Sequence, residues 1–134
     1  MKKILFVCYG NVGRSQIAEA FYNKFTNSDD AKSAGVGYGV ASRYKHPTEE
    51  IIRVMLEENI DISGNKVKAL TKEMADSAEK IIIMCELTDC PKYLLDSGKT
   101  MHMPIADPYG ININYTRSVR DEIKKMILEL IHAD

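Results

Sequence analysis

Residues 4–7 form an uninterrupted apolar run, and the chain then reads Cys-Tyr-Gly-Asn-Val-Gly-Arg-Ser over residues 8–15. Beyond this segment, apolar side chains recur at the three- and four-residue spacing of a helix: Ile17, Ala20, Phe21 and Phe25. These patterns predict a buried strand over residues 3–8 and a helix over residues 15–25. Because the first amides of a helix have no partners within it, the sequence predicts an anion-binding site at this junction.

Later segments alternate in the same way between apolar runs and amphipathic stretches. The predicted strands cover residues 31–34, 80–85 and 100–105, and the predicted helices cover 47–59, 90–95 and 116–132, with a further short helix from Thr71. The helix over 47–59 is expected to bury one face: Ile51, Ile52, Met55 and Leu56. Residues 35–45, with three glycines and two tyrosines, are predicted to form a surface loop. Strands that alternate with helices predict an α/β domain with a mainly parallel sheet.

The composition is that of an ordinary globular domain. The chain has 134 residues, of which 45 % are hydrophobic, and it contains no internal repeat, so we expect one domain over residues 1–134. A net charge of −1 without a basic stripe argues against nucleic-acid and membrane partners. The apolar run near the N-terminus is short for a signal peptide, and three cysteines do not indicate a secreted disulfide framework, which together favour the cytoplasm.

The loop over residues 8–15 combines a nucleophile with groups that bind a tetrahedral oxyanion. Five residues separate the thiol of Cys8 from the guanidinium of Arg14, enough chain to surround one oxyanion with backbone amides. Arg14 can bind two oxygens at once, and its charge favours the thiolate form of Cys8. Ser15 can donate a hydrogen bond to that sulfur. The predicted phosphate-binding residues are Tyr9, Gly10, Asn11, Val12, Gly13, Arg14 and Ser15.

A leaving alkoxide or phenoxide needs a proton, and Asp107 is the predicted general acid. Pro108 biases Asp107 toward an extended conformation, and Tyr109 can stack on an aryl group of a substrate. The alternative is that this segment forms only a turn with a surface tyrosine. Two other charged segments have simple interpretations: Glu19 as a solvated or locally paired carboxylate, and residues 66–68 (Lys-Val-Lys) as a solvated face.

The loop resembles the signature of the low-molecular-weight protein tyrosine phosphatase family, Cys-x-Gly-Asn-x-Cys-Arg-Ser, with Gly13 in place of the second cysteine. The resemblance extends over nearly the whole chain and includes Ala18-Glu19, Ser33-Ala34-Gly35, residues 60–63 and Asp107-Pro108-Tyr109. It implies a three-layer fold, with a central four-stranded parallel sheet flanked by helices. It also implies a two-step hydrolysis, in which Cys8 attacks phosphorus and Asp107 first protonates the leaving group and then activates water.

The same superfamily contains thioredoxin-coupled arsenate reductases, and other segments are similar to theirs. Gln16 follows the loop, where phosphatases usually have proline and the reductases glutamine. Residues 84–91 are similar to the reductase segment that carries two resolving cysteines, here Cys85 and Cys90. The resemblance implies a thiol relay in which Cys8 attacks arsenate, Cys85 attacks Cys8, and Cys90 closes a disulfide with Cys85. The alternative is that Cys85 is a buried thiol at a strand end and that Cys90 begins a helix.

Three tyrosines are candidates to wall a cleft for a phenyl phosphate, as aromatic residues do in the phosphatases: Tyr38, Tyr44 and Tyr109. For Tyr38 and Tyr44 the alternative is that they are exposed loop residues. The three histidines, His46, His102 and His132, show no metal-ligand spacing with the cysteines. We therefore predict no metal site and no cofactor.

The leading prediction is a protein tyrosine phosphatase or aryl phosphomonoesterase with a cysteinyl-phosphate intermediate, in which Cys8 is the nucleophile, Arg14 the phosphate clamp and Asp107 the general acid and base. Its expected partners are a phosphotyrosine protein or a small aryl phosphate, with phosphate and other oxyanions as inhibitors. The alternative is an arsenate reductase that uses Cys8, Cys85 and Cys90, and only this alternative calls for thioredoxin. A third hypothesis is a non-catalytic phosphate-binding module.

Overall fold

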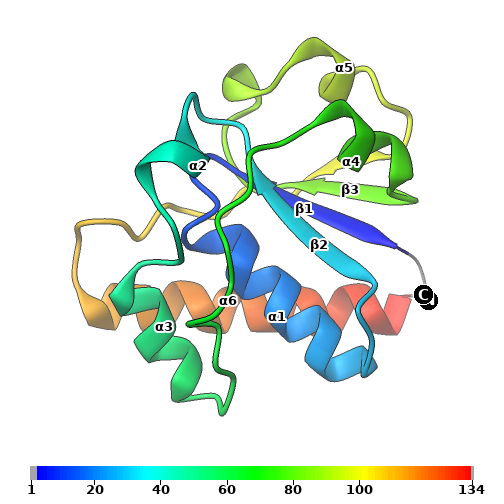
Figure 1. Ribbon diagram of the computed structural model, residues 1–134. Helices are drawn as coiled ribbons and strands as arrows, with labels where there is room; N and C mark the ends of the chain where they lie inside the picture. Colours follow the sequence, from blue (N-terminus) through cyan, green and yellow to red (C-terminus); the bar gives the residue numbers. More distant parts are fainter. Residues whose placement is uncertain (1–2, 134) are drawn as a thin grey trace.

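The computed structural model describes residues 3–133, so Met1, Lys2 and Asp134 of the predicted domain lie outside the described residues. A parallel sheet of four strands lies at the centre, in the order β2-β1-β3-β4 (Figure 1). The strands are β1 (Ile4–Cys8), β2 (Ala31–Gly35), β3 (Lys80–Ile83) and β4 (Thr100–His102). The predicted α/β class with a four-stranded parallel sheet is therefore confirmed.

The strand β1 lies inside the sheet, between β2 and β3. Its pairing places Cys8 opposite Gly35 of β2 and Val7 opposite Ile83 of β3. All the residues of β1 are buried, because helices cover both faces of the sheet. Cys8 is thus the last residue of an inner strand, at the carboxyl edge where parallel sheets bind their ligands.

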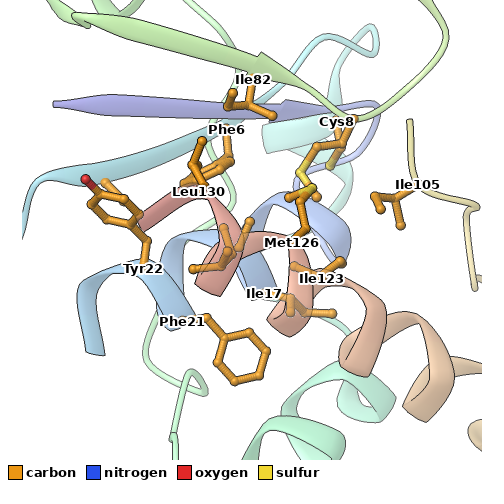
Figure 2. Packing of buried hydrophobic residues seen from close by; sticks show 14 of the residues in the cluster. Phe6, Cys8, Ile17, Phe21, Tyr22, Ile82, Ile105, Ile123, Met126 and Leu130 are labelled. Carbon is orange, nitrogen blue, oxygen red and sulfur yellow. The ribbon is translucent and has the colours of Figure 1, made fainter. Parts of the chain in front are cut away.

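Helices form the two outer layers. Their bounds are α1 (Arg14–Thr26), α2 (Val40–Arg43), α3 (Glu49–Leu56), α4 (Lys72–Ser77), α5 (Lys92–Leu95) and α6 (Ile113–Ala133), with a short 3-10 helix η1 (Leu87–Asp89). On one face, α1, α3 and α6 pack against Phe6, Cys8 and Ile82 (Figure 2). On the other, α4 and α5 pack against Val7 and Ile83. The fold therefore has the three layers that the family resemblance implies.

The longest helix, α6, is amphipathic and lies along α1 beneath the sheet (Figure 1). It buries an apolar stripe: Val119, Ile123, Met126, Ile127 and Leu130. Its other face carries charged residues. Within residues 3–133, no helix is long and apolar enough to cross a membrane.

Several predicted boundaries are wrong. The predicted loop over 35–45 contains α2, and α6 begins at Ile113 rather than at residue 116. The strand β3 ends two residues early, at Ile83 rather than Cys85. The last strand ends at His102 rather than at residue 105, although the amides of Met103 and Ile105 still donate to the carbonyl oxygens of Ile83 and Met84 over 2.9 and 3.1 Å. The third helix is shorter than the predicted 47–59, and it buries Val54 where the sequence predicts Leu56, which is 51 % exposed.

Candidate functional site

The sulfur of Cys8 lies at the carboxyl end of β1, and this residue is only 2 % exposed. The backbone amide of Asn11 donates to the sulfur over 3.2 Å, and the hydroxyl oxygen of Ser15 lies 2.9 Å from it. The helix α1 begins at Arg14, which places the positive end of its dipole next to the loop. Two donors and a helix N-terminus suit a sulfur that carries negative charge.

The turn after β2 holds the beginning of the loop by close backbone contact. The amides of Val36 and Gly37 donate to the carbonyl oxygens of Cys8 and Tyr9 over 3.0 and 2.9 Å. A Cβ atom at Gly35 would lie 2.8 Å from the carbonyl oxygen of Tyr9, so no larger residue fits there without moving the loop. The loop geometry therefore depends on β2 as well as on β1.

The guanidinium of Arg14 is anchored at one end and available at the other. Its Nη1 donates to the carbonyl oxygens of Met84 and Ile105 over 3.2 and 2.9 Å. Its Nη2 lies 3.8 Å from Oδ2 of Asp107, whose side chain is 61 % exposed. The residue as a whole is 8 % exposed. Arg14 is thus fixed by the backbone that follows β3 and β4, while Nη2 remains beside the pocket, next to the predicted acid.

A pocket of about 180 Å³ opens over the loop. It brings together residues from distant parts of the chain: Cys8, Tyr9, Gly10, Val12, Gly13, Arg14, Arg43, Tyr44, Asp107 and Tyr109. Asp107 also accepts the amide of Tyr109 over 3.0 Å, so this segment forms a turn and at the same time faces the pocket. The loop, the predicted acid and two of the three predicted wall tyrosines therefore share one cavity.

Tyr38 lies outside this cavity. It is 95 % exposed and precedes Gly39, whose left-handed backbone (φ 67°) turns the chain into α2. The buried residue of this segment is Val40, which holds α2 against the protein while Tyr38 faces solvent. The pocket has instead a wall residue that the sequence did not single out, Arg43. An exposed arginine in a predicted loop gave no signal for this placement.

Cys85 and Cys90 lie beside the site but in the other layer. Cys85 comes two residues after β3, is 4 % exposed and packs with Val7 and Leu94, on the face of the sheet opposite Cys8. Burial raises the pKa of the Cys85 thiol to about 12, and the nearby Cys90 and Cys8 add to the shift. Burial also raises the pKa of Cys90, which is half-buried against the same cluster. All three cysteines are free thiols.

Two histidine side chains lie close to backbone carbonyl oxygens. His46 Nδ1 lies 2.8 Å from the carbonyl oxygen of Pro47, and His102 Nε2 lies 2.8 Å from that of Cys85. Over residues 3–133, no group of three or more His, Cys, Asp or Glu side chains is arranged to hold a metal ion. The nucleophilic and charged groups that line the pocket are the thiol of Cys8, the guanidinium groups of Arg14 and Arg43, and the carboxylate of Asp107.

The chain belongs to the low molecular weight phosphotyrosine protein phosphatase family, because the model of that family matches residues 3–133. A curated relative, the glutaredoxin arsenate reductase of Synechocystis sp., is 32 % identical, and the match covers 98 % of this chain and 97 % of the relative.

Solved structures similar to this chain carry both kinds of name. A low molecular weight protein tyrosine phosphatase from T. tengcongensis matches with a TM-score of 0.84 at 26 % identity, covering 100 % of both chains. An arsenate reductase in the phosphate binding state matches with a TM-score of 0.82 at 27 % identity, covering 99 % of this chain and 98 % of the other. Phosphatases and reductases thus share the fold described here.

Proposed function

We propose that this protein is an arsenate reductase in which Cys8 attacks the oxyanion and the pair Cys85 and Cys90 takes up the oxidation. The observation that carries the proposal is the placement of that pair: Cys85 is buried, and the half-buried Cys90 packs against the same cluster, next to the strand end that adjoins Cys8. Hydrolysis of a phosphate ester needs one thiol, whereas reduction needs a thiol that resolves the first. The 32 % identity to a glutaredoxin arsenate reductase supports the same assignment.

In the first step, the thiolate of Cys8 attacks arsenic and an arsenic–oxygen bond breaks. The departing oxygen takes up protons and leaves as water, so that a covalent bond joins the Cys8 sulfur to arsenic(V). Arg14 Nη2 is free to bind the oxygens of the tetrahedral anion, because Nη1 is held by backbone carbonyls. Asp107, with Oδ2 3.8 Å from Nη2, is in position to supply a proton to the departing oxygen.

In the second step, the thiolate of Cys85 attacks the Cys8 sulfur. The sulfur–arsenic bond breaks, its electron pair stays on arsenic, and arsenite leaves while a Cys8–Cys85 disulfide forms. Cys90 then attacks the sulfur of Cys85, which releases Cys8 as a thiolate and leaves a Cys85–Cys90 disulfide. Two thiols are oxidised and arsenic gains the electron pair, so the exchange is balanced.

The relay requires movement of residues 84–91. In the structure Cys85 faces the layer of α4 and α5, and its pKa of about 12 keeps it protonated at neutral pH. Exposure of Cys85 to the pocket would remove the burial that raises its pKa. The same movement would therefore bring Cys85 close to Cys8 and increase the fraction of Cys85 that is thiolate. The half-buried Cys90 is the more accessible thiol of the pair, and a protein dithiol of the thioredoxin or glutaredoxin type would reduce the final disulfide.

An aryl phosphatase is the second candidate, and a specific observation favours it. Asp107, Tyr44 and Tyr109 line the same pocket as Cys8, as a phenyl phosphate site requires. The sequence places this function first and reduction second. We reverse the order because hydrolysis leaves the neighbouring thiol pair unused, whereas reduction uses every cysteine of the chain.

Paired assays on the purified protein test the proposal. Arsenate reduction is measured with NADPH, thioredoxin reductase and thioredoxin, or with glutathione and glutaredoxin, and hydrolysis is measured with para-nitrophenyl phosphate. We expect Cys85→Ser and Cys90→Ser to lose arsenate turnover and to retain hydrolysis of the aryl ester. Cys8→Ser is expected to lose both activities, because it removes the shared nucleophile.

Thr88→Ser is the matched control, since Thr88 is an exposed residue of the same segment. It is expected to leave both activities unchanged. Efficient ester hydrolysis without arsenate turnover in any reductant would contradict the reductase proposal and favour the phosphatase. Binding of phosphate without either reaction would favour a non-catalytic module.

A further inference from the structure

The two peptide groups on either side of Cys85 are held by different partners. The carbonyl oxygen of Met84 accepts Nη1 of Arg14 over 3.2 Å and the amide of Ile105 over 3.1 Å. The carbonyl oxygen of Cys85 lies 2.8 Å from Nε2 of His102. Because a carbonyl oxygen can only accept, His102 carries a proton on Nε2 and donates it. Arg14 lines the pocket and His102 does not, so the first chemical step gives His102 no role.

The turn that follows Cys85 is held weakly to the rest of the protein. Two backbone amides near its end donate to carbonyl oxygens near its beginning over 3.1 and 3.0 Å, so residues 86–90 bond among themselves. Within residues 3–133, no side chain other than that of His102 reaches in from outside the turn to donate to a carbonyl oxygen of residues 85–90. His102 is therefore the point at which β4 holds the backbone that carries the thiol pair.

The relay requires Cys85 to leave the face of the sheet on which it packs with Val7 and Leu94. The bonds of a Cα atom have fixed directions, so the Cβ of Cys85 cannot change sides while both flanking peptide groups stay in place. Rotation about χ1 moves the sulfur but leaves Cβ on the same face. The preceding peptide group binds Arg14, whose position the first step needs. The following peptide group is therefore the one that turns, and its turning breaks the bond from His102.

We infer that His102 is a positioning residue for the resolving thiol: its Nε2–H group holds the carbonyl oxygen of Cys85, and this bond breaks when Cys85 turns toward Cys8. The inference rests on the proposed reductase, whose second step uses Cys85, and it names the group that holds the closed form. In that form Cys85 is buried, and burial keeps its pKa high and its thiol protonated. The ring donates in its neutral form, so the hold needs no change in the charge of His102.

Loss of this bond has a defined consequence. The closed form has one hydrogen bond that the open form lacks, so its removal raises the ratio of open to closed molecules by about three- to tenfold. The packing of Cys85 against Val7 and Leu94 remains in the variant. The segment therefore stays mostly closed, and the equilibrium is shifted rather than abolished. Because a buried thiol reacts only when it is exposed, its alkylation rate reports the open fraction.

The test is the initial rate at which iodoacetamide alkylates Cys85 at about pH 8, measured by peptide mass spectrometry on the fully reduced protein without any oxyanion. His102→Leu is expected to raise the rate at Cys85 by about three- to tenfold. The rate at Cys8 in the same samples is the internal reference, and it should stay the same because the contacts of Arg14 are unaffected.

Two amide variants separate the hydrogen bond from the bulk of the ring. The side-chain nitrogen of glutamine reaches about as far as Nε2 of histidine, so His102→Gln keeps a donor for the carbonyl oxygen and is expected to restore a rate close to that of the wild type. Asparagine is one carbon shorter, so His102→Asn is expected to react as fast as His102→Leu. His132→Leu is the control, because His132 is an exposed residue near the end of α6, and it should match the wild type.

The inference is overturned if Cys85 reacts no faster in His102→Leu than in His132→Leu, or if His102→Gln is as fast as His102→Leu. Should His102→Leu fail to fold, equal Cys85 rates in His102→Gln and His102→Asn overturn it. The labelling contains no arsenate, so its result is separate from the proposed function. An active reductase with an unchanged labelling rate refutes only the role of His102. A protein without arsenate turnover whose Cys85 reacts faster in His102→Leu refutes the reductase and still shows that His102 holds the segment.

Discussion

The three thiols lie in two regions that are built in opposite ways. In the loop region, Asn11, Ser15 and Gln16 are fully buried, and their side-chain hydrogen bonds join the loop to β2 and to residues 65–68. In the segment that carries the other pair, residues 86–89 are exposed and η1 has only three residues. The Sγ of Cys90 lies 3.7 Å from the carbonyl oxygen of Glu86, which is a long hydrogen bond.

This difference matches the demands of the two proposed chemical steps. Attack on a tetrahedral oxyanion profits from a rigid set of donors that is complete before the substrate arrives. A thiol relay instead needs a segment that can change position between steps. In the proposed reaction, the fold therefore holds the groups of the first step in place and leaves the second step to a weakly held segment.

The largest expected effect concerns the thiol of Cys85. Its pKa of about 12, against an ordinary value of 9.0, implies that its thiolate fraction near pH 8 is reduced about a thousandfold, as long as the segment stays closed. Alkylation of Cys85 in the native protein should therefore be slower than that of Cys90, and it should keep rising above pH 10. Peptide mass spectrometry after timed labelling measures both rates. A Cys85 profile with its midpoint near pH 9 would mean that the segment is open in solution.

Substitutions at the centre of each region test whether the two regions contribute differently to the free energy of unfolding. Asn11→Ala removes an amide that satisfies buried partners and leaves a non-glycine residue at positive φ. We expect it to lower the free energy of unfolding by about 3 kcal/mol. Thr88→Ala, its counterpart in the exposed segment, should change it by less than about 0.5 kcal/mol. Urea denaturation measures both, and equal losses would remove the distinction between the regions.

Two glycines offer a second matched pair. A Cβ at Gly35 would lie 2.8 Å from the Tyr9 carbonyl oxygen and 3.0 Å from the Gly10 carbonyl carbon, and these are backbone atoms that cannot turn aside. Gly35→Ala should destabilise the protein by about 2 kcal/mol and lower activity, since the loop must shift. Gly98→Ala, with no atom within 4 Å of the added Cβ, should be neutral to thermal unfolding and to ester hydrolysis. A fully active Gly35→Ala variant would show that the loop tolerates displacement.

The smallest expected effect lies in the helices behind the loop. Glu57, next to the end of α3, binds Arg117 and Arg120 of α6 over 2.7 and 2.6 Å. Its hydrogen bonds with Arg117 and then Arg120 lower its pKa to about 2. Because the unfolded chain takes up this proton first, the stabilisation is present above about pH 4.5 and is lost as the pH falls toward 2. Thermal unfolding of Glu57→Gln should show a flatter acid limb than that of the wild type, and an identical limb would refute the assignment.

The fold could be predicted from the sequence because its main signals are local. The apolar run of β1 and the helical spacing after Arg14 are patterns that burial imposes directly. Residues 100–105 show where such signals fail, since the regular pairing of β4 with β3 ends at His102 although the amides of Met103 and Ile105 still bond to Ile83 and Met84.

For the site, the residues of the loop could be predicted to lie together, and most of them line one pocket, whereas Asn11 and Ser15 are buried behind it. Arg43 could not, because its position depends on how α2 folds back over the loop. The sequence predicts that Lys68 is solvated, whereas the structure pairs it with Glu19. The two residues are 49 positions apart, and no local sequence pattern relates segments that far apart. Tyr38 and Tyr44 are both tyrosines of one predicted loop, so the sequence does not distinguish them. The left-handed turn at Gly39 leaves Tyr38 exposed, whereas Tyr44, after α2, lines the pocket.

The most direct test of the account is a single turnover of Cys90→Ser with arsenate in the absence of reductant. The variant retains the first two thiols but cannot resolve the disulfide between them. We predict that one equivalent of arsenite is released and that a tryptic map contains a peptide in which Cys8 is linked to Cys85. Cys85→Ser treated in the same way should give neither product. Intact, unlinked Cys8 and Cys85 peptides from Cys90→Ser, with no arsenite formed, would contradict the account.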